Sequence, residues 1–159
     1  MKFIADRMLG RLSRWLRLFG YDTLEIKKQE NEDDTLLALA EKDERILVSR
    51  DRVLIRKAIK REIRTYLVQS PEIMEQLREM QEEFGISIEP QLERCTLCNS
   101  VIRKVKPEEM ELVRAKDYVY PDRLGEGTEF WLCDNCGQVY WQGKHWENIM
   151  ERAERLKKS

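Results

Sequence analysis

The chain has 159 residues, enough for a single well-packed core, or for a domain of about 90 residues followed by a small module that could not fold unaided. Charged residues make up 37% of the chain, but 29 basic and 30 acidic side chains leave a formal net charge of −1, so the overall charge favours neither a nucleic-acid nor a membrane partner. No apolar run is long enough to cross a bilayer, and an aspartate and an arginine already stand at positions 6 and 7, so we expect no signal peptide, no membrane partner and a cytoplasmic location.

The first 90 residues alternate short apolar segments with longer amphipathic ones. We expect strands at 2–5, 21–26, 45–49 and 65–68. We expect helices at 8–19, with Gly20 at its C-terminal end, from Asp33 or Asp34 to about 40, from about 50 to about 60, and from Pro71 to Gly85. Strands that alternate with helices at this spacing predict an α/β fold, with a mostly parallel sheet covered by helices on both faces.

Two of the expected helices carry many basic residues. At about 100° per residue, the apolar face of the helix at 8–19 holds Met8, Leu9, Leu12, Trp15, Leu16 and Phe19, and the opposite face holds Arg7, Arg11, Arg14 and Arg17. The segment from 50 to 64 has seven basic residues against two acids, the basic ones being Arg50, Arg52, Arg56, Lys57, Lys60, Arg61 and Arg64. Both surfaces could flank a cleft and neutralise phosphates, or they could be solvated faces interleaved with salt bridges.

Acidic residues follow the expected strands where each strand ends. Asp6 follows the first strand, Asp51 follows the third, and the pair Asp33 and Asp34 opens the helix between them. The carboxyl ends of parallel strands share one edge of the sheet, where ligands usually bind, so we expect these acids to converge. Neighbouring carboxylates raise one another's pKa unless a cation lies between them, and Mg²⁺ or Mn²⁺ is the usual one. The alternative for each acid alone is structural, as a helix cap or, for Asp6, an ion pair with a neighbouring arginine.

All four cysteines of the chain fall in two Cys-x-x-Cys pairs, with 34 residues between the pairs. This spacing predicts a zinc site with four thiolate ligands, which are Cys95, Cys98, Cys133 and Cys136. Such a site is structural, since the protein fills every coordination position and leaves none for chemistry. The alternatives are two disulfides, or cysteines that lie in a core.

Aromatic residues crowd the same segment. Trp131, Tyr140, Trp141 and Trp146 could form the miniature core of a small module or stack on unpaired bases. His145 is the only histidine, and we expect it to be structural or to contact RNA, because four cysteines already complete the zinc ligands.

Several segments, taken together, resemble a known protein family. Asp6, the segment RLSRWLRLFGYDT, the segment DDTLLALA and the segment ILVSRD resemble the PIN-like ribonuclease domain found at the C-terminus of the mutator-seven exonuclease and, as stand-alone proteins, in prokaryotes. CTLCN and CDNCGQVYWQGKHW are similar to the zinc ribbon that accompanies that domain. The resemblance implies a PIN-like nuclease domain at 1–90, a zinc ribbon at 91–146 and a C-terminal helical tail at 147–159.

The resemblance also implies which residues form the active site. Asp6 matches the first PIN acid, Asp33 or Asp34 the second, and Asp51 the aspartate of a Ser/Thr-x-Asp motif in which Ser49 positions Asp51 or a metal-bound water. Many PIN domains have a fourth acid shortly after the third, whereas this chain continues with arginine, valine and leucine at 52–54. The missing fourth acid therefore puts in question the catalytic activity that the resemblance implies.

We interpret the chain as a metal-dependent ribonuclease that cleaves single-stranded RNA, with Mg²⁺ or Mn²⁺ held by Asp6 and Asp51 and one structural zinc per chain. The candidate RNA-binding residues are Arg7, Arg11, Arg14, Arg50, Arg52, Arg56, Lys57 and Lys60. The alternative is a weak or inactive enzyme that acts as an RNA-binding or adaptor protein, and a third possibility is that the zinc ribbon docks a protein partner. We expect the N-terminal domain to keep its fold when a zinc ligand is lost, since its own apolar faces supply a core.

Overall fold

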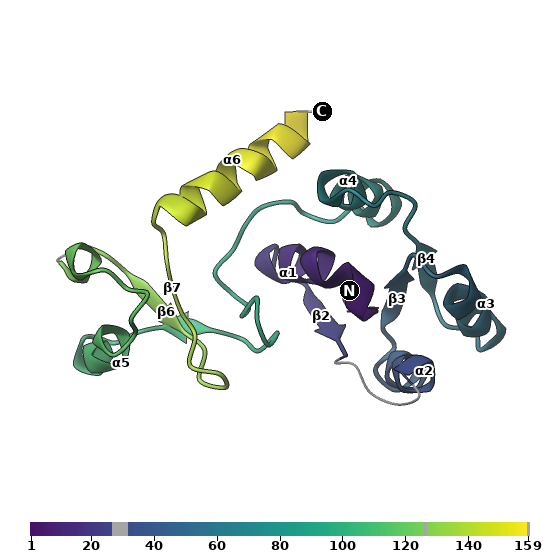
Figure 1. Ribbon diagram of the computed structural model, residues 1–159, viewed down its shortest axis with the longest axis horizontal. Coiled ribbons are helices and arrows are strands. Elements are labelled where there is room, and N and C mark those ends of the chain that lie inside the picture. The colour runs from purple at the N-terminus through teal and green to yellow at the C-terminus, as the bar shows by residue number, and fades with distance from the viewer. Residues whose placement is uncertain (27–31, 126, 159) are drawn as a thin grey trace.

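A computed structural model describes residues 1–26, 32–125 and 127–158 of the chain (Figure 1). Residues 27–31, between the second strand and the second helix, residue 126, and residue 159 at the end of the expected tail lie outside the described residues. Within the described part, no helix is both long and apolar enough to span a bilayer.

The N-terminal part is built on a parallel sheet of four strands. The strands are β1 (Lys2–Ala5), β2 (Asp22–Glu25), β3 (Ile46–Ser49) and β4 (Thr65–Leu67). They lie in the order β2-β1-β3-β4, and every neighbouring pair is parallel. The α/β fold with a parallel sheet is therefore confirmed.

Helices cover both faces of this sheet, as expected. They are η1 (Arg7–Leu9), α1 (Gly10–Leu18), α2 (Glu32–Asp43), α3 (Arg52–Lys60) and α4 (Ile73–Phe84). Successive strand residues point to opposite faces, so Phe3 and Val48 join the core under α1 and α4, whereas Ile4 and Leu47 join the core under α2 and α3. Figure 1 shows the two pairs of helices on opposite sides of the sheet.

The start of the first helix differs from the expected amphipathic pattern. Residues 7–9 form a turn of 3-10 helix, and the α-helix begins only at Gly10. Met8, expected on the apolar face, is therefore 80% exposed. The helix before Gly85 also begins later than expected, with Glu72 as its N-cap, so Pro71 precedes the helix and is not in its first turn.

Arg17 was expected on the basic, solvated face and is instead buried, with 4% of its surface exposed. Its Nε donates a hydrogen bond to the carbonyl of Thr23 at 2.9 Å, and its Nη1 donates one to the carbonyl of Thr96 at 3.0 Å. The expectation fails because β2 and the first cysteine loop both contact this guanidinium, whereas Arg11 and Arg14 remain exposed.

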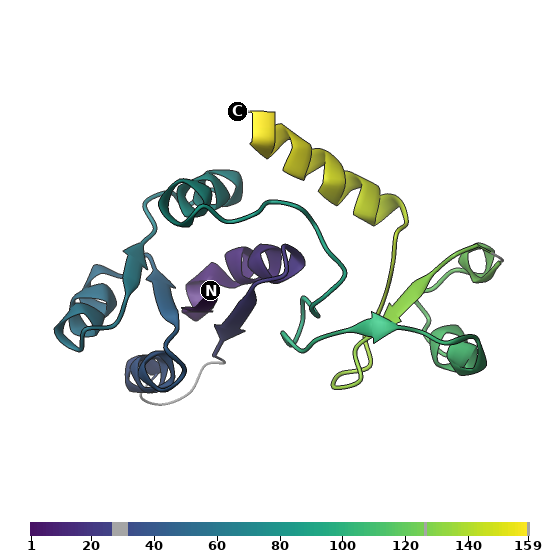
Figure 2. The same ribbon diagram turned by 180° about the vertical axis from the view of Figure 1, so that it is seen from behind.

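The C-terminal part contains a small antiparallel sheet and ends in a long helix (Figure 2). Its elements are β5 (Arg103–Lys104), η2 (Pro107–Glu109), α5 (Met110–Arg114), η3 (Pro121–Leu124), β6 (Phe130–Leu132), β7 (Val139–Trp141) and α6 (Lys144–Lys158). Helix α6 runs back from the small sheet toward α4 and α1. Its residues Ala153 and Leu156 are buried in the core that α1 and α4 share with the parallel sheet. The expected tail is thus a helix packed on the N-terminal part.

Candidate active site and metal centre

The predicted acids lie at the carboxyl end of the two central strands. Asp6 directly follows β1, and Asp51 comes two residues after β3, its neighbour in the sheet. From β1 the chain proceeds to β2 on one side, and β3 lies on the other, so the strand order reverses between β1 and β3. Ligands of open α/β sheets bind at this switch point. A cavity of about 370 Å³ opens there, and its charged lining residues are Asp6, Arg7, Glu32, Asp33, Arg50 and Asp51. We call it the acidic cavity.

A chain of hydrogen bonds fixes the two strand-terminal acids. The Ser49 hydroxyl, which is fully buried, donates a short hydrogen bond to Oδ2 of Asp6. The same hydroxyl oxygen accepts a hydrogen bond from the backbone N–H of Asp51 at 2.9 Å. Ser49 therefore links the end of β1 to the turn after β3.

Both aspartates also act as helix caps, which is the structural role that the sequence left open for each of them. Oδ1 of Asp6 accepts the N–H of Met8 at 2.9 Å, and Oδ1 of Asp51 accepts the N–H groups of Val53 and Leu54 at 2.9 and 3.2 Å. Each cap uses one carboxylate oxygen. Among the described residues, Oδ2 of Asp51 has no hydrogen-bond partner, which leaves it available to a ligand.

The protonation of Asp6 reflects its surroundings. Burial raises the pKa of this carboxyl, and the nearby carboxylates of Asp51 and Glu32 raise it further. The hydrogen bonds from Ser49 and from the N–H of Met8 act in the opposite direction and lower the pKa. A cation in the cavity would offset the repulsion between the three acids.

Glu32 is an acid of this cavity that the sequence analysis missed. Helix α2 begins at Glu32, one residue before the expected start, so its first turn presents Glu32 together with Asp33 to the cavity. The Glu32 side chain is 22% exposed, and its Oε2 lies 3.3 Å from Nε of Arg7. Its Oε1 is buried without a hydrogen-bond partner among the described residues. Glu32 thus supplies a fourth carboxylate from α2 rather than from the residues after Asp51.

Oxygen donors alone make up this set of ligands, and such a set fits Mg²⁺ or Mn²⁺. The orphaned oxygen of Glu32 and the free oxygen of Asp51 both favour a cation there. The acids are spread apart, however. Across residues 1–26, 32–125 and 127–158, the four cysteines are the only group of three or more potential ligands whose donor atoms all lie within 4.8 Å of one another. The acids would have to draw together to share one ion.

The structure separates the two aspartates of α2. Asp33 lines the acidic cavity, and its Oδ2 lies 3.4 Å from Nζ of Lys57. Asp34 is exposed and does not line the cavity. The sequence left open whether Asp33 or Asp34 is the second acid of the site, and the position of Asp33 in the cavity favours Asp33.

The predicted RNA-binding residues fall into three groups. Arg7 and Arg50 line the acidic cavity itself. Arg52, Arg56, Lys57 and Lys60 lie on the exposed side of α3. Arg11 and Arg14 are exposed farther along α1, where they line two other cavities.

The four cysteines converge as predicted, and all are free thiols. Sγ of Cys95 lies 3.6 Å from Sγ of Cys136, and Sγ of Cys98 lies 3.4 Å from Sγ of Cys133. These separations are far longer than a disulfide and close to the roughly 3.8 Å between thiolates around a tetrahedral zinc at 2.3 Å. The four-cysteine group could therefore bind a metal ion such as zinc, and the disulfide alternative is wrong for this structure.

The two cysteine loops repeat the same backbone geometry. The residue after each second cysteine, Asn99 or Gly137, has a left-handed backbone with φ of 72° or 80°. Its N–H donates to the carbonyl of the first cysteine of the pair, Cys95 or Cys133, at 2.9 and 2.8 Å. Glycine suits this conformation best, so an asparagine in the first loop indicates a role for the side chain.

That role is to attach the first cysteine loop to the parallel sheet. Oδ1 of Asn99 accepts the backbone N–H of Thr23 at 2.9 Å, and Nδ2 of Asn99 donates to Oδ1 of Asp22 at 2.7 Å. Thr23 lies in β2, the edge strand of the sheet. The four-cysteine group and the edge of the parallel sheet are therefore in direct contact.

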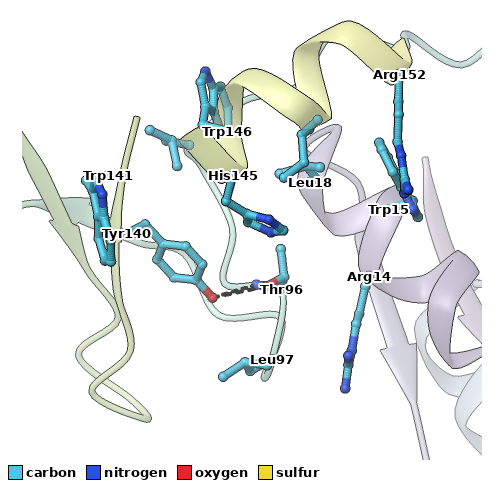
Figure 3. Close-up of a pocket in the computed structure, with 12 residues that line it drawn as sticks. Arg14, Trp15, Leu18, Thr96, Leu97, Tyr140, Trp141, His145, Trp146 and Arg152 are labelled. Atoms are coloured by element: carbon cyan, nitrogen blue, oxygen red, sulfur yellow. Dashed lines mark hydrogen bonds between the residues drawn. The ribbon is translucent and has the colours of Figure 1, made fainter. Parts of the chain in front are cut away.

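The aromatic residues of the C-terminal part serve mainly as a small core. Trp131 and Tyr140 pack against the cysteines, and Trp141 stacks on Tyr118 with ring centroids 6.2 Å apart. Trp146 packs instead against the core of the N-terminal part, and His145 is exposed. Figure 3 shows that several of these rings also line a cavity between the two parts of the chain.

Comparison with known proteins agrees with this picture. A family model described as the Mut7-C RNAse domain matches residues 1–153, which confirms the resemblance drawn from the sequence. Neither a search of curated proteins nor a search of solved structures found a match.

Proposed function

The chain belongs to the Mut7-C RNAse domain family, and from this premise we propose that it is a metal-dependent ribonuclease that cleaves single-stranded RNA at the acidic cavity. One observation carries the proposal. Four carboxylates, those of Asp6, Glu32, Asp33 and Asp51, share one cavity with Arg7 and Arg50 at the switch point of the parallel sheet. Residues 1–90 would carry this site, and residues 91–146 would hold one structural zinc.

The acids would hold Mg²⁺ or Mn²⁺ through their free oxygens, chiefly those of Asp51 and Glu32. When bound, such an ion lowers the pKa of a water and neutralises charge on the scissile phosphate. Ser49 keeps Asp6 and the backbone of Asp51 in register through its two hydrogen bonds. A general base from the protein is not required.

The arginines of the cavity bind the substrate. The guanidinium groups of Arg7 and Arg50 can each form bidentate hydrogen bonds to phosphate. Arg7 already balances part of the acidic charge through its contact with Glu32, and Arg50 makes only a 3.5 Å contact to the carbonyl of Gln69 among the described residues. Arg50 is therefore the cation most available to an incoming phosphate.

The second candidate function is that of an RNA-binding or adaptor protein with little or no cleavage. Two observations favour it: Asp6 and Asp51 each cap a helix, and the acids are not drawn together as metal ligands. In this case the arginines would still bind RNA, and the acids would be structural.

A matched pair of variants tests the proposed site. In Mg²⁺ or Mn²⁺, Asp33→Asn should reduce the initial rate of cleavage of a single-stranded RNA, whereas Asp34→Asn on the same helix should leave the rate close to that of the unaltered protein. RNA binding without any cleavage by the unaltered protein would support the adaptor function. Equal loss of activity in both variants would refute the assignment of Asp33.

A further inference from the structure

A second cavity, of about 300 Å³, lies between the two parts of the chain. Its lining residues come from α1, from the first cysteine loop and the residues just before it, from β7 and from α6. In Figure 3 the imidazole of His145 projects into this cavity, between Tyr140 and Leu18. We call it the aromatic cavity, and its volume lies at the lower end of the range for small-molecule sites.

Rings supply much of its wall. Trp141, Trp146, Tyr140 and Trp15 line it together with His145. The Tyr140 hydroxyl is held in place, since it accepts the N–H of Thr96 at 3.0 Å. Flat aromatic surfaces of this kind stack on nucleobases with little sequence preference.

Two arginines also line the aromatic cavity. Arg14 projects from α1 and Arg152 from α6, on the side of the cavity nearest the N-terminal part (Figure 3). Neither forms an ion pair with any of the described residues, although ion pairs are frequent elsewhere in this chain. Unpaired guanidinium groups beside a ring-lined cavity match a ligand that combines a base with phosphate.

These arginines continue toward the acidic cavity. Arg152 also lines a third cavity, between α1, α4 and α6, together with Arg11, Arg78 and Arg155 and one acid, Glu72. Arg7, in the 3-10 turn that precedes α1, lines the acidic cavity, and Arg11 lines the third cavity, so the exposed arginines at 7, 11 and 14 form a row that leads from the acidic cavity to the aromatic one. The row spans roughly 12 Å, at about 2.0 Å per residue in the 3-10 turn and about 1.5 Å in α1, which is the length of about three to four nucleotides stacked at 3.4 Å.

We propose that the aromatic cavity binds one unpaired base of the RNA, and that the phosphates on one side of this base follow Arg14, Arg152 and Arg11 toward the acidic cavity. The inference rests on the proposed function, because it takes RNA as the substrate. A protein segment would match the rings as well, but it would not explain a row of arginines that joins the two cavities. The base held here would place the scissile phosphate a few nucleotides away.

His145 and its neighbour Lys144 provide a matched test. Both are exposed at the start of α6, but only His145 lines the cavity. Affinity for a fluorescein-labelled single-stranded RNA of twelve nucleotides would be measured by anisotropy, without divalent cations so that cleavage does not interfere. His145→Ala should weaken binding about tenfold, as expected for the loss of base stacking, whereas Lys144→Ala should change it less than about twofold even though it removes a charge.

Arg14→Gln tests the phosphate path, with Arg114→Gln as its control, because Arg114 is exposed at the end of α5 and does not line the aromatic cavity. Arg14→Gln should weaken binding and reduce the slope of log affinity against log salt by about one, as expected for the loss of one phosphate contact. An RNA of the same length with abasic nucleotides should abolish the difference between the unaltered protein and His145→Ala, and should preserve the effect of Arg14→Gln.

Each outcome separates this inference from the proposed function. Unchanged affinity in His145→Ala, or a loss that persists on abasic RNA, would overturn base binding at this cavity and leave the ribonuclease proposal standing. Equal effects of His145→Ala and Lys144→Ala would also overturn it. If the unaltered protein does not bind RNA at any salt concentration, both the inference and the proposed function fail.

Discussion

Replacement of Asn99 by glycine should lower the free energy of unfolding of the protein, although Asn99 is neither one of the four cysteine ligands nor a lining residue of the acidic cavity. Glycine accepts the left-handed backbone at this position, as Gly137 does in the second cysteine loop, so the loop geometry and the four thiolates are preserved. The substitution therefore removes the side chain alone. What is lost is the attachment of the first cysteine loop to β2.

Two hydrogen bonds determine the size of the effect. The N–H of Thr23, a fully buried residue, loses its acceptor Oδ1 of Asn99, and an unsatisfied buried group costs about 1–3 kcal/mol. Asp22 loses the bond from Nδ2 of Asn99 but keeps the bond from Nη1 of Arg45 at 2.8 Å, so this second loss should cost about 1 kcal/mol. We expect Asn99→Gly to lower the free energy of unfolding by about 3 kcal/mol.

Urea unfolding followed by circular dichroism measures this change. Asn135→Gly serves as the control, because Asn135 is exposed in the second cysteine loop and, among the described residues, its side chain forms a hydrogen bond only to Sγ of Cys98. The control should lose less than about 1 kcal/mol, and both variants should retain their zinc. Hydrogen exchange should also accelerate at the amide of Thr23 in Asn99→Gly. An equal small loss in both variants, with the Thr23 amide still protected, would refute the reasoning.

Three further predictions concern other parts of the fold. Asp6→Asn should abolish cleavage, and in metal-free buffer at pH 7 it should raise the urea midpoint. The reason is that a carboxyl whose pKa is raised on folding destabilises the fold above that pKa and ceases to do so as the pH falls through it. A lower midpoint at pH 7 would contradict this. Cys133→Ser should remove zinc and disorder the C-terminal part. It should also increase hydrogen exchange in β2, whereas the sequence alone predicted that the N-terminal domain would keep its fold without zinc. Unchanged exchange in β2 would support that earlier prediction instead. Arg17→Met should lower the free energy of unfolding, measured in urea, by roughly 2–4 kcal/mol, because it leaves the carbonyls of Thr23 and Thr96 without their donor. A loss below about 0.5 kcal/mol would show that water replaces the guanidinium.

The sequence predicted the parallel sheet and its helices because both periodicities are strong in the first 90 residues. Asp6 and Asp51 could be placed near each other for the same reason, since Asp6 directly follows one buried strand and Asp51 comes two residues after another. The four cysteines needed no structure at all, because their spacing is itself the signal.

Other features depended on contacts between segments far apart in the chain. The helical period groups Arg17 with the exposed arginines of α1, and nothing nearby in the sequence shows that Thr96, 79 residues later, accepts a bond from its guanidinium. Glu32 was missed because the start of α2 was placed one residue too late, although an acid beside the pair at 33 and 34 was a signal for it. Met8 was misplaced because a 3-10 turn precedes α1, which changes the direction of the side chain.

The attachment of α6 to the N-terminal core was equally invisible. The sequence suggested only a helical tail, whereas Ala153 and Leu156 are buried against α1 and α4. Apolar residues on a C-terminal helix show that it packs on something, but not on which part of the chain. Only the three-dimensional arrangement reveals that the tail joins the two parts and thereby forms the aromatic cavity.

The central claim is that the acidic cavity cleaves RNA, and Asp51→Asn tests it most directly. Asparagine keeps an oxygen that can cap α3, so the fold should be preserved while the negative charge available to a metal ion is lost. The measurement is the initial rate of cleavage of a single-stranded RNA in Mg²⁺ or Mn²⁺, alongside the affinity for the same RNA without divalent cations. We predict that cleavage falls at least about a hundredfold, since a bound metal contributes several kcal/mol and each 1.36 kcal/mol is a factor of ten, while the affinity stays within about twofold, since no phosphate-binding arginine is altered. Cleavage by Asp51→Asn at the rate of the unaltered protein would contradict the account.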